Sequence, residues 1–288
     1  MPELPEVETM VRGLRPALGG RRIVEASVLD PFLLHNISAD DFQSRVSGAK
    51  VAIVERRGKW VVIRLAHTRG IIVIQPRMTG GFWLVPPRRP DHVRLTFRMD
   101  GAIGMVWFCD NRRLGKIAWY ATPSAAEAAF RRSHGPDALV IALDDLTARL
   151  QRTARAVKPT LMDQKVLAGI GNIYADEILH RAGVHPERPA ARLLLDELRR
   201  IHGAIGVVLA EAIAAEGSSF DQNYRTVLGS EGGFLNRNAV YGRGGQPCRL
   251  CGALVLKVKI AGLLGRPTHF CPVCQPRRPL RRGGRGGQ

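Results

Sequence analysis

Near the start of the chain, apolar residues recur at intervals of three and four. They are Val7, Met10, Val11, Leu14 and Leu18. This spacing places them on one face of a helix, and Pro5 suits the first turn of that helix. The pattern therefore predicts a helix over residues 5–18, beginning almost at the chain terminus.

The pattern then changes to short segments rich in Val, Ile, Trp and Phe, separated by clusters of Gly, Pro, Asp or Arg. Such segments are typical of antiparallel strands in a sandwich or barrel. They are RRIVEASVL, AKVAIVE, WVVIRLA, GIIVIQ, GGFWLV, HVRLTFRM, IGMVWF and GKIAWY. We therefore predict that residues 1–132 form a mainly β domain.

Helical periodicity replaces the strand pattern from residue 145 onward. It is present in LTARLQRT, TLMDQKVL, NIYADEILHRAG and the long run over residues 190–216. These segments predict amphipathic helices, which places a linker at 133–145 and a helical domain at 146–240. Residues 217–240 show no sustained period, and a loop of that length is usually functional or disordered.

Composition narrows the class of protein. The 288 residues include 43 Lys and Arg against 25 Asp and Glu, a formal net charge of +18, with 45% hydrophobic residues. This excludes wholesale disorder, and the length fits two domains. The charge makes nucleic acid the first candidate partner and an anionic membrane surface the second. No apolar run is long enough to span a membrane and the acidic start is unlike a secretory signal, so we expect a cytoplasmic protein.

About half of that net charge lies in the last seventh of the chain. Residues 248–288 contain nine Lys or Arg residues and no Asp or Glu. The final residues, 277–288, are Pro, Gly and Arg without periodic apolar positions, a composition that cannot bury enough surface to order itself. We expect a basic disordered tail that either contacts DNA or only improves solubility.

Two CxxC pairs stand near the end of the chain. Cys248 and Cys251 form the first, Cys271 and Cys274 the second, with 19 residues between the pairs. This spacing is typical of a four-cysteine zinc site, whose closed thiolate shell makes the metal structural. Two disulfides are the alternative, which a reducing compartment disfavours. We expect one structural Zn²⁺ per chain in a zinc finger at 241–276; Cys109, the fifth cysteine, is expected to be a buried free thiol.

The sequence resembles the bacterial formamidopyrimidine-DNA glycosylases over nearly its whole length. The matching motifs are PELPEVET at 2–9, RGKW with Lys59, NRRLGK at 111–116, AGIGNIYADEIL at 168–179, and the CxxC pairs with GRPTHFC. The resemblance implies an α+β multidomain fold. Its parts would be an antiparallel β-sandwich with an N-terminal helix, a helix-two-turn-helix DNA-binding domain and a C-terminal zinc-finger β-hairpin.

The same resemblance implies a bifunctional enzyme of base excision repair. Such an enzyme removes oxidised purines, chiefly 8-oxoguanine and formamidopyrimidines, and cleaves the abasic strand by β- and δ-elimination. The nucleophile would be the amine of Pro2 after loss of Met1. A secondary amine can attack the sugar C1′ and form an iminium, provided that it is neutral. An α-amino pKa of about 7.7 to 8.0 and the positive end of the following helix both favour the neutral form.

The resemblance also assigns the other catalytic residues. Glu3 matches the general acid/base, and Glu6 matches a second acidic position close to it. Lys59 lies at the tip of a predicted hairpin and matches the lysine that contacts the lesion and its phosphate and donates a proton in elimination. Arg266 matches the zinc-finger arginine that grips a phosphate and assists δ-elimination. Glu8 is expected only to complement the helix dipole.

An enzyme that extrudes a base must fill the gap in the duplex. The matching residues are Met78, Arg112 and Leu114, with Arg113 beside them; the remaining DNA contacts expected from the resemblance are Lys158, Asn172, Tyr241 and Arg266. The chain departs from the family in having Leu114 where Phe is usual. It also has Gln75 and Arg77 in the segment that usually reads HxGMSG, which puts lesion searching in question more than the catalytic amine.

The loop at 217–237 matches the segment that closes over an extruded oxidised purine. The candidate lesion-contacting residues are Ser219, Phe220, Asn223, Tyr224 and Arg225. The expected partner is damaged double-stranded DNA, bound by a monomer at the nucleoid and not at a membrane. Two alternatives stay open at this point: an endonuclease VIII-like enzyme for oxidised pyrimidines, and a catalytically weakened protein that only binds damage.

Overall fold

A computed structural model describes residues 2–67, 70–219 and 224–277. The chain divides into two compact units. Unit 1 comprises Met1–Asp137 and Leu209–Arg237, and unit 2 comprises Ala138–Val208 and Asn238–Gln288. Among the described residues, no helix has both the length and the apolar character needed to cross a bilayer. The expected tail falls almost entirely outside the described residues.

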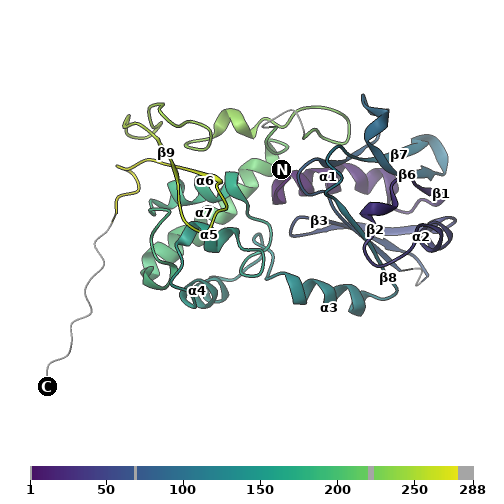
Figure 1. The fold of residues 1–288 in the computed structure, drawn as a ribbon, viewed down its shortest axis with the longest axis horizontal. Helices are drawn as coiled ribbons and strands as arrows, with labels where there is room; N and C mark the ends of the chain where they lie inside the picture. Colours follow the sequence, from purple (N-terminus) through teal and green to yellow (C-terminus); the bar gives the residue numbers. More distant parts are fainter. Residues whose placement is uncertain (1, 68–69, 220–223, 278–288) are drawn as a thin grey trace, which may run out of the picture. The chain divides into compact units, whose positions relative to one another are not determined.

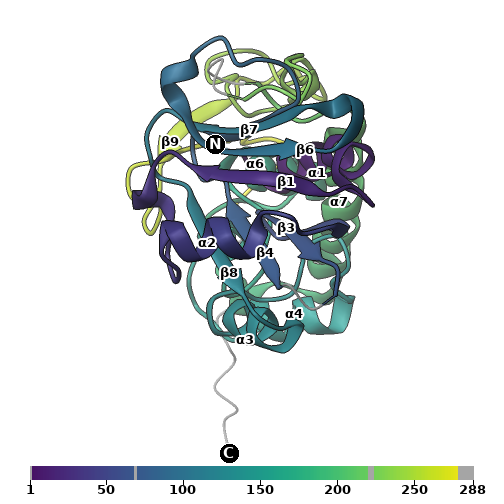
Figure 2. The same cartoon turned by 90° about the vertical axis from the view of Figure 1, so that its right-hand side faces the viewer.

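Unit 1 contains helix α1 and two four-stranded antiparallel sheets (Figures 1 and 2). The first sheet has the order β1 (Ile23–Val28), β6 (Val93–Met99), β7 (Met105–Asp110) and β5 (Gly80–Trp83). The second has the order β2 (Val51–Arg57), β3 (Trp60–Leu65), β4 (Ile71–Gln75) and β8 (Lys116–Tyr120). Each of the predicted strand segments overlaps one of these strands, so the predicted antiparallel sandwich is confirmed.

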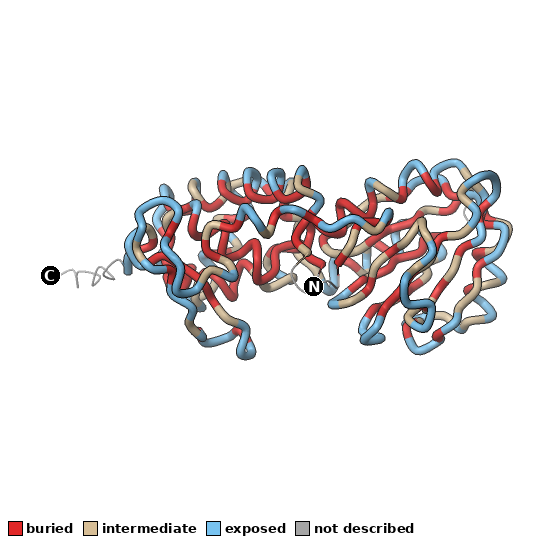
Figure 3. The backbone as a smooth tube through the Cα atoms, turned by 90° about the horizontal axis from the view of Figure 1, so that it is seen from above, coloured by how far each residue is buried: buried red, intermediate tan, exposed pale blue. Residues whose placement is uncertain are grey.

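The first helix explains much of the core of this unit. Helix α1 spans Leu4–Leu18, and all five residues of its predicted apolar face are fully buried in one cluster with side chains from both sheets. Buried stretches are red in Figure 3. The helix begins next to the chain terminus, as predicted, which places the terminal residues at the positive end of the helix dipole.

Two helices of unit 1 were missed. They are α2, Ala39–Val46, capped by the Ser38 hydroxyl, and α3, Pro123–Ser133, capped by the Thr122 hydroxyl. Each buries only two apolar residues: Phe42 and Val46 in α2, and Ala126 and Phe130 in α3. Two anchors are too few to produce a recognisable period. Short 3₁₀ turns lie at Pro31–Leu33, Pro90–His92, Gly101–Ile103 and Phe234–Arg237.

The segment Leu209–Arg237 groups with unit 1, whereas the sequence interpretation kept it in the helical domain. Val227 packs against Gly13 of α1 so closely that a Cβ on that glycine would lie 2.3 Å from Val227 Cγ2. The Leu84 N–H donates to the Val227 carbonyl at 2.8 Å. These contacts are long-range, so local periodicity gives no sign of them.

Unit 2 contains α4 (Leu143–Gln151), α5 (Val157–Met162), α6 (Asn172–Ala182), most of α7 (Leu195–Ala214), a 3₁₀ turn at Ala190–Arg192, and a hairpin of β9 (Leu256–Lys259) and β10 (Pro267–Phe270).

The predicted helix in TLMDQKVL ends at Met162. The Asp163 carboxylate accepts from the Lys165 N–H, and the Gln164 amide binds the carbonyls of Met162 and Ile170. These side-chain bonds to backbone replace the helical ones.

Candidate active site

The chain terminus forms the first part of the site. Pro2 and Glu3 are both buried, and Glu3 is the residue that precedes α1 in extended conformation. The Glu3 N–H donates to Glu6 Oε2 at 2.8 Å. The terminal residues are therefore held in a fixed geometry at the start of the helix, where the positive end of its dipole disfavours a protonated amine.

Glu6 connects this terminus to the beginning of the expected lesion loop. Its Oε1 accepts from the Ser218 N–H at 2.7 Å, and the Tyr224 hydroxyl donates to the Glu216 carbonyl at 3.0 Å. Gly217 has φ +83°, and a Cβ there would lie 2.8 Å from Glu6 Oε1. Both carboxylate oxygens of Glu6 thus bind backbone N–H groups. These bonds hold Glu6 between the chain terminus and Ser218, and its expected catalytic role stays a prediction.

Lys59 lies where the sequence placed it, in the turn between β2 and β3. Arg57 pairs with Trp60, so Gly58 and Lys59 form a two-residue turn with glycine first. Burial and the like charges of Arg57, Lys59 and Arg77 lower the pKa of His134 below its ordinary value. Lys59 and Arg77 thus both lie near His134, and their charges suit an anion such as phosphate, whereas Arg57 is paired with Glu127.

Two of the expected gap-filling residues are apolar side chains with open surface. Met78 and Leu114 are each 39% exposed, and Arg112 Nη1 lies 3.3 Å from Met78 Sδ. The structure thus brings together the loops that carry all three residues. Exposed apolar side chains next to an arginine can enter a base stack and bond to a base left without its partner.

The connection between these loops is Asp110, which sequence reasoning missed. This carboxylate is fully buried; it accepts from the Thr79 hydroxyl through Oδ1 and from the Gly115 N–H through Oδ2, the latter at 2.6 Å. The Arg112 N–H donates in turn to the Thr79 hydroxyl at 3.0 Å. A buried, fully bonded carboxylate of this kind specifies one relative arrangement of the two loops.

Arg113, another expected DNA contact, forms an ion pair within unit 1. Its guanidinium donates to both oxygens of Asp30 at 2.6 and 2.9 Å and lies over the Phe32 ring, 5.1 Å from its centroid. This bidentate pair holds the pKa of Asp30 below its ordinary value. The guanidinium is thus paired with a buried carboxylate, while the Arg113 side chain is 53% exposed, so its expected DNA contact stays a prediction.

A cavity of about 400 Å³ lies in unit 1. Its apolar lining comes mainly from strands β5 and β7, with Met10 of α1, and its basic lining from the loop before β6 and from Arg225; the lining residues are Met10, Thr79, Gly80, Gly81, Trp83, Pro87, Arg88, Arg89, His92, Cys109, Asn111, Tyr224 and Arg225. Cys109 is the expected buried thiol, and burial raises its pKa to about 12. A nucleobase-sized ligand fits this volume.

The expected lesion loop contributes to this cavity through Tyr224 and Arg225. The Ser219 hydroxyl donates to the Tyr224 carbonyl at 2.8 Å and accepts from the Gly232 N–H at 2.9 Å, so Ser219 holds the loop together. Arg225 binds Glu231 at 2.7 Å. Phe220 and Asn223, also predicted for this loop, lie outside the described residues.

In unit 2, Asn172 and Arg266 lie close to each other. Asn172 is the first residue of α6, and its Nδ2 donates at 3.1 Å to the carbonyl of Pro267, the residue after Arg266. Arg266 itself is exposed. A helix N-terminus next to an exposed arginine is a suitable site for a phosphate.

Lys158 does not have the expected role of a phosphate contact. Its side chain has no exposed surface, and its ammonium pairs with Asp176 at 2.8 Å and donates to Thr268 Oγ1 at 3.0 Å. Asp176 also accepts from the His269 N–H at 2.9 Å. Lys158, which belongs to α5, therefore links that helix to α6 and to strand β10. Its charge is neutralised by Asp176 inside the protein.

Tyr241, another expected DNA contact, is half-buried with its ring 5.0 Å from the ring of His269. Its N–H donates to Glu177, which also accepts from the N–H groups of Ala239 and Val240. Burial raises the pKa of Glu177. Sequence reasoning missed Glu177, although a carboxylate among the apolar positions of NIYADEIL was a possible signal.

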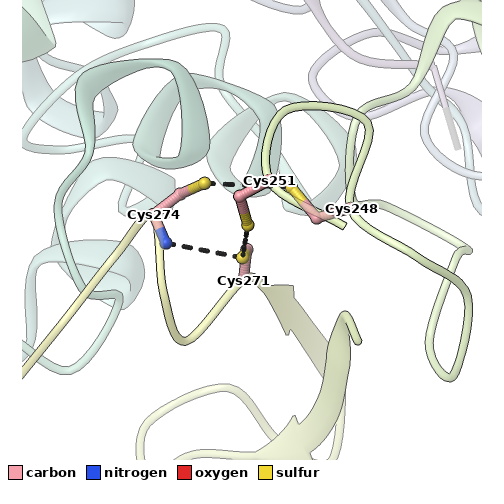
Figure 4. A group of neighbouring side chains, drawn as sticks. All are labelled: Cys248, Cys251, Cys271 and Cys274. Carbon is pink, nitrogen blue, oxygen red and sulfur yellow. Dashed lines mark hydrogen bonds between the residues drawn. The ribbon is translucent and has the colours of Figure 1, made fainter. Parts of the chain in front are cut away.

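The four cysteines of the two CxxC pairs converge (Figure 4). Their sulfur atoms all lie within 4.8 Å of one another, and none of the four forms a disulfide. Cys251 and Cys271 Sγ are 3.4 Å apart, and Cys248 and Cys274 Sγ are 3.8 Å apart. A tetrahedral zinc with Zn–S bonds of about 2.3 Å requires sulfur separations of about 3.8 Å. The donor set fits one structural zinc, as predicted.

Family models match three successive parts of the chain. Residues 1–117 match the formamidopyrimidine-DNA glycosylase N-terminal domain, and residues 134–223 match the formamidopyrimidine-DNA glycosylase H2TH domain. Residues 245–277 match the zinc finger found in FPG and IleRS. The matches correspond to the β-sandwich, the helical segment and the four-cysteine hairpin.

Relatives that match over their full length point to the same family as these models. The formamidopyrimidine-DNA glycosylase of Thermus thermophilus is 40% identical over 283 residues, which are 97% of this chain and 100% of the relative. The crystal structure of the MutM (Fpg) protein of the same species matches with a TM-score of 0.84 at 39% identity, covering 96% of this chain and 100% of that one. A complex of a Lactococcus lactis FPG mutant with Fapy-dG-containing DNA matches with a TM-score of 0.85 at 30% identity and the same coverage.

Proposed function

The chain belongs to the formamidopyrimidine-DNA glycosylase family, and from this premise we propose that it is a bifunctional DNA glycosylase and abasic-site lyase of base excision repair. It removes oxidised purines, 8-oxoguanine and formamidopyrimidines, from double-stranded DNA. One structural zinc supports the finger. Because its substrate is chromosomal damage, we place its action at the nucleoid.

The observation that carries this proposal is the geometry of the terminus. Pro2 and Glu3 are buried at the start of α1, and Glu6 holds them in place. Loss of Met1 leaves a secondary amine next to a carboxylate, the two groups that amine attack and proton relay require.

The reaction follows from these groups. The neutral Pro2 amine attacks C1′ and the glycosidic bond breaks, so the base leaves with a proton and an iminium forms. Glu3 relays protons as the sugar ring opens. The iminium withdraws electrons from C2′, so loss of the C2′ proton expels the 3′ phosphate, and a second elimination expels the 5′ phosphate. Lys59 donates a proton in elimination.

The 400 Å³ cavity of unit 1 is our candidate receptacle for the extruded base. Gly80, Gly81 and Trp83 line it, and Asn111 supplies hydrogen-bonding groups. Tyr224 and Arg225 bring the lesion loop to the same cavity. The arrangement supports a base-binding role for the loop at 217–237.

A lesion panel tests the proposed function. We expect single-turnover cleavage of duplexes with 8-oxoguanine to exceed that of duplexes with an oxidised pyrimidine by about tenfold or more. The reverse order would indicate an endonuclease VIII-like enzyme. Binding without cleavage of any duplex, including one with a preformed abasic site, would indicate a damage-binding protein.

A second prediction concerns Leu114. Leucine has no flat ring to stack on a base, and an aromatic contact is worth about 1–3 kcal/mol, so Leu114→Phe should accelerate cleavage at 8-oxoguanine about fivefold or more. At a preformed abasic site, which has no base to unstack, the rate should stay unchanged. Equal changes on both substrates, measured in single turnover, would exclude Leu114 as the wedge.

A third prediction concerns Arg266. If the exposed guanidinium neutralises one phosphate, Arg266→Ala should reduce the magnitude of the slope of log K against log salt by about one unit. Arg113→Ala is the matched control: it removes a guanidinium bound by Asp30, so its slope should equal that of the unmodified protein. An unchanged slope for Arg266→Ala would place this residue away from DNA.

A further inference from the structure

A network of charged side chains that includes Arg56, Glu8 and Asp137 contacts the turn that carries Lys59. Their exposures are 7% for Arg56, 12% for Glu8 and 14% for Asp137. Arg56 Nε donates to Glu8 Oε2 at 3.0 Å, and Arg56 Nη2 donates to Asp137 Oδ1 at 3.0 Å. The network thus joins helix α1, strand β2 and the segment after α3, all within unit 1. It also corrects the interpretation of Glu8 as a residue that only complements the helix dipole.

The same network binds the backbone of Gly58, the first residue of the turn, at both its carbonyl and its N–H. Arg56 Nη1 donates to the Gly58 carbonyl at 2.9 Å, and the Gly58 N–H donates to Asp137 Oδ2 at 2.7 Å. Gly58 has φ +56°, a conformation that favours glycine. Gly58, immediately before Lys59, is therefore held by hydrogen bonds to the largely buried Arg56 and Asp137 side chains as well as by the pairing of strands β2 and β3.

We propose that Arg56 is a positioning residue that sets the place of Lys59 relative to the Pro2 amine. Pro2 and Glu3 stand at the start of the helix that carries Glu8. Arg56 binds that helix with one edge of its guanidinium and binds the turn, directly and through Asp137, with the other. The inference rests on the proposed function, because it acts through the role proposed for Lys59.

A role in fold stability alone is a weaker explanation of this network. Buried ion pairs often contribute little net stability, because the cost of desolvating the charges offsets their attraction. The planar guanidinium instead offers a rigid set of donors that a lysine cannot reproduce. Catalytic groups, by contrast, need placement within about 0.5 Å, and a misplacement of about 1 Å can lower a rate by about 100-fold.

A double-mutant cycle in single turnover tests the proposal. The variants are Arg56→Met, Lys59→Met and the double variant, assayed as full-length protein lacking Met1 on an 8-oxoguanine duplex. We expect Arg56→Met to lower the maximal rate constant about 10- to 100-fold with an unchanged half-saturating protein concentration. The double variant should be no slower than Lys59→Met alone, because a residue that acts through Lys59 has no effect once the ammonium is gone.

Two further variants complete the experiment. Arg64→Met is the matched control: it removes a more exposed arginine from the Arg64–Glu55 pair of the same hairpin and should leave the rate unchanged. Arg56→Lys retains the charge without the bidentate geometry and should give an intermediate rate. If thermal unfolding shows that Arg56→Met is not folded, the cycle is run with Arg56→Lys.

The outcomes distinguish a failure of the positioning role of Arg56 from a failure of the proposed role of Lys59. An unchanged rate in the Arg56 variant, or losses that multiply in the double variant, would overturn the positioning role while leaving the proposed function intact. An unchanged rate for Lys59→Met would overturn both the positioning role and the proposed role of Lys59.

Discussion

Protein that retains Met1 is expected to lose cleavage of 8-oxoguanine duplexes by about 10³-fold or more, because the attacking amine is then in a peptide bond. The borohydride-stable crosslink to the duplex should disappear with it. DNA binding should persist, since zinc, Asn172 and Arg266 are untouched. The measurement compares single-turnover cleavage and crosslink yield in preparations with Met1 removed or retained, verified by mass spectrometry.

Pro2→Gly is the matched control for this prediction. It keeps a free α-amine at the same position but makes it primary and less constrained, so it should weaken the crosslink without abolishing it. Peptide mapping of the crosslink decides the assignment: attachment at Lys59 or another lysine would contradict the role of Pro2.

Removal of zinc is expected to abolish measurable binding to duplex DNA at physiological salt. Among the described residues, the buried core around the metal consists of Val240, Val255, Cys248 and Cys271, with Ala253 and Cys274 packed against it, so the finger has few apolar contacts without the ion. Structural zinc contributes about 10–16 kcal/mol of binding free energy that is coupled to folding. Arg266, on the same hairpin, would then lose its place beside Asn172.

Elemental analysis should find one zinc per chain, and Cys251→Ala should lower both zinc content and DNA affinity. The β-sandwich should stay folded in this variant, because its core is separate from the finger; near-ultraviolet circular dichroism of its tryptophans reports on that. Active protein without zinc would contradict the prediction, as would a Cys251→Ala variant that binds DNA normally.

The site shows where linear motifs are reliable and where they are not. The local structures predicted around Pro2, Glu3, Lys59 and the four cysteines are present, because a helix start, a two-residue turn and a CxxC pair are each visible in the chain. The catalytic roles of Pro2, Glu3 and Lys59, which the family resemblance implies, stay predictions. Lys158 and Arg113 look the same in sequence as any DNA-binding cation. Their partners, Asp176 and Asp30, are 18 and 83 residues away, so only the fold reveals that these side chains form ion pairs within the protein.

Sequence alone determined the α1 helix, the eight strands, the α6 helix and the metal ligands, because apolar period and ligand spacing are local properties. Only the tertiary structure decided that Leu209–Arg237 packs with the β-sandwich and that Glu6 binds the Ser218 N–H. The same is true of Asp110, which joins the loop of Met78 to the loop of Arg112 and Leu114. These contacts form because buried polar groups need hydrogen-bond partners, and the partners are distant in the sequence. A buried carboxylate needs hydrogen-bond donors, and only the folded chain determines which ones it finds.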